Sequence, residues 1–303
     1  MHLSAAPTFP TGGDGAGADR VATSVSLSRG ELFAALSVLG FANGITGRVQ
    51  GSLLKEGLAL ALAGTFDTSA IVWVAFLACP VMFLRGPREA PRRLDLMVAA
   101  GVLASVMLPI APLSWVALTA LALYILLNPF APDRARSRSA VPPSSAHRGA
   151  WILLAITGSM FWGRVLLFSA SAPVLGADAQ LVGWLAGVET AGNTVRFADG
   201  EGYVWIAPYC SSISNISLAV LCWVMFSQFR GLAWTLRTTA WCLLAALSVV
   251  VINVTRISLM VLHKEQFDLI HGPVGAAVAS WLSVAAVLGI CMWGTRRARA
   301  ALA

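Results

Sequence analysis

Three side chains in the second half of the chain have the chemistry of nucleophilic catalysis. Cys210 borders a polar loop in the stretch YVWIAPYCSSISN, Arg256 lies near the end of the apolar run VVVINVTRISLMVLH, and His271 directly precedes a Gly-Pro pair. A thiolate is a nucleophile, a neutral imidazole can take up a proton, and a guanidinium can stabilise an oxyanion or bind a carboxylate. Together these residue types predict a cysteine-dependent acyl transfer.

The local sequence predicts how these side chains are placed. Proline is favoured at the first position of a helix, so the proline two residues before Cys210 predicts that a helix begins there, with its dipole favouring the thiolate. Asn253 precedes Arg256 by three residues, which puts both on one helix face. His271 would stand at a helix N-terminus, where the charged imidazolium is disfavoured. His263 is the competing proton carrier.

The chain that carries these residues has the composition of a membrane protein. It is 57% hydrophobic and only 12% charged, whereas ordinary globular chains are about 25% charged. Apolar runs of about 17–25 residues cross a bilayer. We predict spans at 31–47, 67–84, 94–111, 114–128, 151–169, 208–228, 238–259 and 274–294. The stretch 49–64 contains a lysine and a glutamate, and lying along the membrane surface is its alternative to crossing it.

The distribution of arginines predicts the orientation. Arginine clusters occur at 85–93, 134–148, 230–237 and 296–299. Threading eight spans in alternation puts all four clusters on one side, which the positive-inside rule identifies as the cytoplasm. The net charge of +7 is then explained without a nucleic-acid partner. We expect a multi-pass protein of the bacterial inner membrane with Cys210 facing the periplasm.

Polar segments divide the chain. Short β-prone runs, TVRF and YVWI, are bounded by the turn sequences AGN and DGEG, which predicts a small hairpin or meander outside the bilayer. The fold class is an all-α polytopic membrane protein with about eight transmembrane helices and a small extracytoplasmic β hairpin before the sixth. The expected parts are a disordered cytoplasmic tail (1–30), an amino-terminal helical half (31–130), a cytoplasmic linker (131–149), a catalytic half (150–295) and a basic tail (296–303).

The five cysteines do not have the spacing of a metal site or a disulfide framework. No CxxC occurs, and all but Cys210 fall inside apolar runs, where cysteine behaves as a small hydrophobic residue. We therefore expect neither a metal nor a cofactor.

The carboxy-terminal half resembles the exosortase/archaeosortase family of membrane-embedded transpeptidases. The resemblance rests on APYCSS leading into one span, NVTRIS ending the next and His271 opening the last, over roughly 150–295. It implies that Cys210, Arg256 and His271 are catalytic. Asn253, Ser211 and Ser212 are candidate substrate-binding or supporting residues. The family commonly has glycine where this chain has Ser212, a change that would narrow the site or alter the substrate chosen.

The resemblance also implies the partners. Such enzymes act on exported proteins whose carboxy-terminal sorting tail has a short motif, a transmembrane helix and basic residues. The thiolate would form a thioester at the outer face of the inner membrane, and an unidentified acceptor nucleophile would release the protein, in connection with surface or exopolysaccharide attachment. The other expected partner is the lipid bilayer.

Other classes of protein share some of these features. A polytopic transporter could use Arg256 to bind an anion between helices. An intramembrane serine protease would use Ser211 or Ser212, although the chain lacks a G-x-S-x-G setting there. A non-catalytic scaffold of an exopolysaccharide machine would need none of these groups.

Overall fold

The computed structural model describes residues 27–108, 110–128 and 144–300. Most of the predicted tail 1–30 and of the predicted linker 131–149 lies outside the described residues. The helices are α1 (Arg29–Ala63), α2 (Ala70–Leu84), α3 (Arg93–Met107), α4 (Ala111–Leu127), α5 (Ser145–Thr157), α6 (Gly163–Ser169), α7 (Ser171–Ala186), α8 (Ser212–Phe229), α9 (Leu236–Leu262), α10 (Phe267–His271) and α11 (Pro273–Ala300). The strands are β1 (Thr190–Ala191), β2 (Thr194–Arg196) and β3 (Tyr203–Trp205).

Each of the eight predicted ranges contains helical structure. Five helical segments are long and apolar enough to cross a membrane, and α2 and α4 are apolar but shorter. The five are Arg29–Leu62, Ser145–Ser169, Ser212–Phe229, Leu236–Leu262 and Val274–Ala298. The described chain is therefore a helical protein with several helices of membrane-spanning length. Two helices, α7 and α10, lie where the sequence predicted none.

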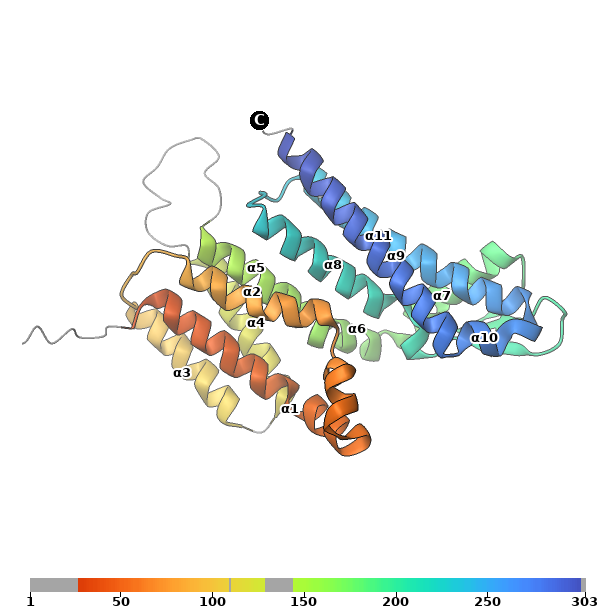
Figure 1. The fold of residues 1–303 in the computed structure, drawn as a ribbon, viewed down its shortest axis with the longest axis horizontal. Coiled ribbons are helices and arrows are strands. Elements are labelled where there is room, and N and C mark those ends of the chain that lie inside the picture. Colours follow the sequence, from red (N-terminus) through yellow and green to blue (C-terminus); the bar gives the residue numbers. More distant parts are fainter. Residues whose placement is uncertain (1–26, 109, 129–143, 301–303) are drawn as a thin grey trace, which may run out of the picture.

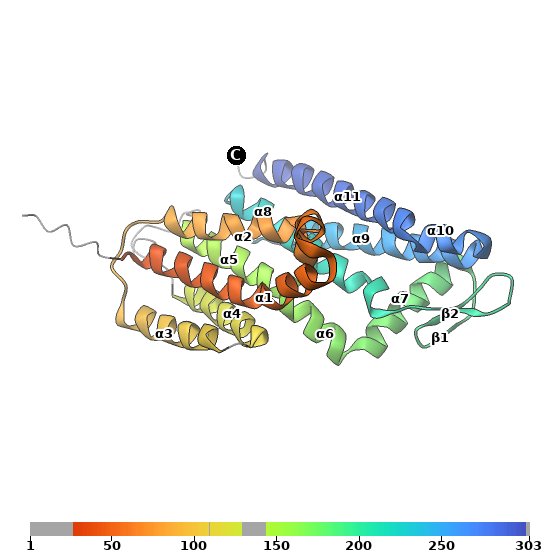
Figure 2. The same cartoon turned by 60° about the horizontal axis from the view of Figure 1, so that its bottom comes forward.

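Helices α1 to α5 pack around one apolar core and form one side of the molecule, as Figures 1 and 2 show. The weakly apolar start of α1 approaches α4 through its glycines. A Cβ at Gly40 would collide with the Leu118 side chain, and one at Gly44 with the Trp115 ring. Small residues at such positions let two helix backbones come close, which is how helices associate in lipid.

The second part of α1 leaves this bundle. The helix is broken at Gly57, whose φ of 75° lies in the left-handed region. In Figure 1 the turns around this break lie below α2. Leucines here are exposed, with Leu54 at 87%. The stretch 49–64 is therefore helical and presents apolar side chains away from the protein.

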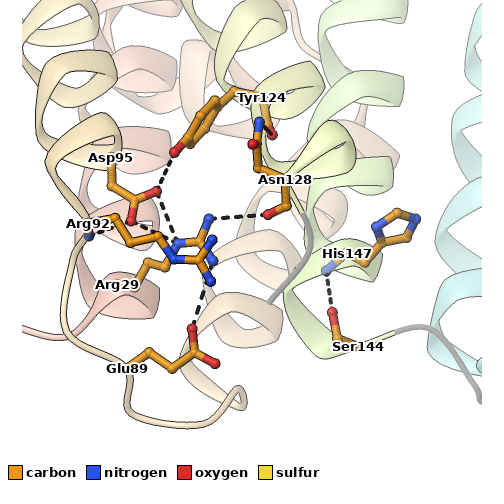
Figure 3. A network of polar contacts seen from close by, with 8 residues as sticks. All are labelled: Arg29, Glu89, Arg92, Asp95, Tyr124, Asn128, Ser144 and His147. Atoms are coloured by element: carbon orange, nitrogen blue, oxygen red, sulfur yellow. Dashed lines mark hydrogen bonds and ion pairs between the residues drawn. The ribbon is translucent and has the colours of Figure 1, made fainter. Parts of the chain in front are cut away.

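A buried ion pair ties α1 to α3 at one end of the bundle (Figure 3). Arg29 and Asp95 are fully buried, with Arg29 Nε 2.9 Å from Asp95 Oδ2. The Tyr124 hydroxyl donates to Asp95 at 2.7 Å, and Arg29 donates to the Asn128 carbonyl at 3.2 Å. Removing one partner of such a pair typically costs about 3–5 kcal/mol, because the other charge is left buried. The network fixes how α1, α3 and α4 meet.

The connection from α5 to α6 is one turn of π-helix, Gly158–Trp162. Helix α7 follows after a break at Ala170 and ends at Gly187, which adopts a left-handed conformation (φ 68°). The predicted β runs are confirmed as β2 and β3, and β1 adds a third strand to an antiparallel meander. Val195 is buried beneath this sheet. Beyond β3 the chain passes into the turn that contains Cys210.

Helices α8, α9 and α11 form the other side of the molecule, and α9 and α11 run side by side in both views (Figures 1 and 2). Trp223, Val249, Val287 and Cys291 belong to the apolar core between them. The sheet lies near one end of α9, where the Ala198 amide donates to the Val261 carbonyl at 3.1 Å. This end of the molecule therefore gathers the sheet, α7 and α10.

Candidate active site

Cys210 lies in a short 3-10 turn, Pro208–Cys210, and not in the first turn of α8. Pro208 does open a helical turn, but the prediction that Cys210 lies in the first turn of the long helix is wrong. Ser211 has an extended backbone and its hydroxyl accepts from the Ile213 amide at 3.3 Å, so it caps the helix, and Ser212 is the first helical residue. A serine with this backbone at the N-cap is a stronger start signal than the proline that opens the preceding turn.

This placement changes the electrostatics of the thiol. Burial raises the pKa of the half-buried Cys210 thiol, and the positive charge of Arg256 acts in the opposite direction without overcoming it. The expectation of a depressed pKa is therefore wrong, because desolvation penalises the thiolate more than its neighbours favour it. Cys210 is nevertheless the least buried of the five free cysteines, the other four being buried.

Asn253 from α9 holds the turn that carries the thiol. Its side-chain amide donates to the Cys210 carbonyl at 2.7 Å and to the Ser212 hydroxyl at 3.1 Å. Only 6% of Asn253 is exposed, so both hydrogen bonds are largely shielded from water. The position of Cys210 is therefore set by a contact between α8 and α9.

Asp178 is a site residue that the sequence reasoning missed. It comes from α7, is 5% exposed, and accepts from the Ser212 amide at 3.0 Å. A carboxylate is stabilised by the free amides at a helix N-terminus. The signal was present as an acidic residue within the largely apolar stretch VLGADAQLVGWLA, since a buried acid there needs a partner.

Arg256 joins α9 to α10. Its guanidinium donates to the Ile270 carbonyl at 3.2 Å and to the His271 carbonyl at 3.0 Å. The His271 imidazole is exposed and stacks on Phe267, with ring centroids 5.2 Å apart and an angle of 7° between the rings. Arg256 thus contacts the backbone of His271 and acts electrostatically on Cys210.

The structure brings some of the predicted residues together and not others. Asn253, Ser211 and Ser212 surround the Cys210 turn, and Arg256 lies within electrostatic reach. Neither Arg256 nor His271 forms a hydrogen bond to the thiol within the described part of the chain. His263 is exposed at the end of α9. The His271 imidazole would have to turn away from Phe267 to take part in chemistry at Cys210.

A polar cavity of about 260 Å³ opens beside this group, between α8, α9, α11 and the start of α2. Asn253 and Arg256 line it from α9, Asn215 from α8, and Ser280 and Ser283 from α11. Polar side chains are rare between helices of membrane-spanning length. Where several of them line one cavity, as here, they are typical of a site or path for a polar group.

The fold and this site describe a helical protein with segments of membrane-spanning length and a partly accessible thiol beside an arginine. Comparison with protein-family models, with curated proteins and with solved structures found no match. The resemblance to the exosortase/archaeosortase family therefore stays a prediction.

Proposed function

We propose that the protein is a cysteine-dependent transpeptidase or endopeptidase of the exosortase type, with Cys210 as its nucleophile. The observation that carries this proposal is the Cys210 turn itself. It is tied to α9 by Asn253 and to α7 through Asp178, and it holds the least buried thiol within the field of Arg256. A thiol that served only as a small apolar side chain would not need such support.

The chemistry follows from the three side chains. His271, once turned from Phe267, takes the proton of the Cys210 thiol. The thiolate attacks the peptide carbonyl, and the oxyanion that forms is stabilised by Arg256, which cannot act as an acid or base because it keeps its proton. The protonated His271 then delivers that proton to the leaving amine as the C–N bond breaks. A thioester remains on Cys210, and an acceptor nucleophile then attacks it and restores the thiol.

A serine nucleophile is less well supported. The Ser211 and Ser212 hydroxyls are both buried, and both already accept hydrogen bonds, from the Ile213 amide and from Asn253 respectively. Attack would require breaking the contacts that start α8. We therefore assign the nucleophile to Cys210.

The proposed arrangement in the membrane has eight spans with both termini in the cytoplasm, the stretch 49–64 on the membrane surface, and Cys210 on the outer face of the bacterial inner membrane. The arginine clusters support this orientation. An alkaline phosphatase fused near Gly200 should be active, and one fused near Ser139 inactive. The reverse pattern would place Cys210 in the cytoplasm and remove the basis of the proposal.

The proposed substrates are exported proteins with a carboxy-terminal sorting tail, transferred to an acceptor of unknown kind. The proposal that part of the substrate lies in the membrane is supported by an apolar groove of about 420 Å³. It is lined by Val251 and Leu259 of α9 and by Val278 and Leu282 of α11, and Arg256 lines it as well. An apolar segment lying there would pass beside Arg256.

The test is co-expression with a protein that ends in such a tail, followed by its shift on a gel. Cys210→Ala should abolish processing, whereas Cys242→Ala, which removes a buried thiol of α9, should leave it intact. His271→Ala should slow turnover strongly, and if it does not, His263 becomes the proton carrier to test. Normal processing by Cys210→Ala would end the proposal.

The polar cavity favours a second candidate, a transporter that binds an anion at Arg256. Uptake of an anionic solute that survives Cys210→Ala and is lost in Arg256→Ala would establish it. The same cysteine variant therefore separates the two functions.

A further inference from the structure

A second polar pocket lies between α1, α6 and α8 and contains two arginines. Its volume is about 290 Å³. Arg48 from α1, Arg164 from α6, Asp67 from the turn before α2, and Ser214 from α8 are among the residues that line it. None of them belongs to the catalytic group proposed above.

The two guanidinium groups are incompletely neutralised. Arg48 is half-buried, donates one hydrogen bond to the Asp67 carbonyl at 3.0 Å, and lies within the electrostatic field of Arg164. Arg164 makes no hydrogen bond or ion pair with any residue that the structure describes. The single carboxylate of Asp67, which is exposed, leaves a net positive charge in the pocket.

Two like charges in one pocket disfavour each other, and a negative charge between them removes this cost. Arg48 is half-buried and Arg164 is exposed, so the cost falls mainly on Arg48. An arginine inside a membrane-length helix is also costly by itself. Arg164 lies in the segment Ser145–Ser169. A chain that keeps both arginines here therefore gains from an anion between them.

The available donors favour a phosphoryl group over a carboxylate. Each guanidinium is a planar fork that can donate two parallel hydrogen bonds, and one fork suffices for the two oxygens of a carboxylate. Among the residues that the structure describes, Arg164 makes no hydrogen bond, Arg48 uses one of its N–H groups, and the Ser214 hydroxyl makes none. A phosphoryl group has enough oxygens to receive all three side chains.

We propose that this pocket binds a phosphoryl group between Arg48 and Arg164, carried either by a phospholipid headgroup or by free phosphate. The pocket adjoins the polar cavity that Asn253 and Arg256 line, because Ser69 and Leu218 line both. A bound phosphoryl group would thus lie close to the start of α8. The proposal does not depend on Cys210 being a nucleophile.

The test uses the purified full-length chain in a non-ionic detergent and follows its thermal unfolding. The probes are dioctanoyl phosphatidic acid, dioctanoyl glycerol with the same chains and no phosphoryl group, and inorganic phosphate. Arg164→Gln is the main variant, since its side chain holds no other described residue in place. Arg237→Gln, at the opposite end of α8 and α9, is the control for removing one positive charge.

Without a probe, Arg164→Gln should be at least as stable as the wild type, because the repulsion between the Arg48 and Arg164 charges has been removed. Phosphatidic acid should raise the melting temperature of the wild type and of Arg237→Gln, and its affinity for Arg164→Gln should be weaker by about tenfold or more, as expected for losing charge-assisted hydrogen bonds. Arg48→Gln should weaken binding in the same direction.

The other probes identify the source of the phosphoryl group. Stabilisation by phosphatidic acid alone indicates a lipid, and stabilisation by inorganic phosphate as well indicates a site for the free ion. Equal stabilisation by dioctanoyl glycerol, or equal affinity of wild type and Arg164→Gln for phosphatidic acid, would overturn the proposal.

Discussion

Replacing Asn253 should release the turn that carries the reactive thiol. The Asn253 amide donates two hydrogen bonds, to the Cys210 carbonyl at 2.7 Å and the Ser212 hydroxyl at 3.1 Å. At about 1 kcal/mol net for each, Asn253→Ala weakens the closed turn by about 2 kcal/mol. If alkylation occurs from the opened turn, its rate at Cys210 should rise by about 30-fold, since each 1.4 kcal/mol is a factor of about ten.

The assay is the rate at which a membrane-impermeant maleimide modifies Cys210 in the purified chain, measured by peptide mass spectrometry. Ser248→Ala is the matched control, because the Ser248 hydroxyl bonds only to the Ala245 carbonyl of its own helix, at 2.8 Å. Cys79, which is 1% exposed, reports global unfolding and should stay unmodified. An unchanged rate in Asn253→Ala would refute the idea that this amide holds the turn. Modification of Cys79 alongside Cys210 would show that the whole fold had loosened instead.

Other substitutions test the remaining contacts of the site. Arg256→Ala removes the charge that lowers the pKa of Cys210 and leaves the burial that raises it, so the pH profile of alkylation should move to higher pH. Arg256→Lys should move it less, and identical profiles would contradict the electrostatic role. Asp178→Ala should lower the free energy of unfolding by about 1–2 kcal/mol, as for the loss of a helix cap, and an unchanged thermal midpoint would count against this role. Gly183→Ala would place a Cβ against the Thr190 methyl and lower the free energy of unfolding by about 1–3 kcal/mol. Adding Thr190→Ser, which removes that methyl, should restore stability, and a failure to do so would show that the clash is elsewhere.

Apolar run length predicts the main helices well, because burial in lipid or in a helical core selects the same residues. Every predicted span contains helical structure, and the TVRF and YVWI runs are paired strands. Helix α7 was missed because its apolar residues were read as part of a loop between spans. The partner of Asp178 could not be predicted, because α7 packs on α9 and only this packing brings the Asp178 carboxylate to the Ser212 amide at the start of α8.

The sequence predicted that certain residues would lie near one another, but not how they would be arranged. Residue type and spacing singled out Cys210, Asn253 and Arg256, and the structure places them near one another. The start of α8 was misplaced, because Ser211 was weighed as a possible nucleophile and not as a cap. The pKa direction was wrong, because burial raises the pKa of the Cys210 thiol by more than the charge of Arg256 lowers it. Arg164 was overlooked inside an apolar run.

The π turn between α5 and α6 makes the protein tolerant of losing one residue at that point. Gly158–Trp162 closes through a hydrogen bond from the Gly163 amide to the Gly158 carbonyl, which takes up one residue more than an α turn does. Deleting a single residue here would convert the π turn into an α turn and leave Arg164 on the same side of the helix. The same deletion in the regular part of α5 would rotate everything beyond it by about 100°. Related chains that lack one residue in the π turn would therefore be expected to keep the arginine pair, and chains that lack one elsewhere in α5 to lose it, although their hydropathy profiles would be indistinguishable.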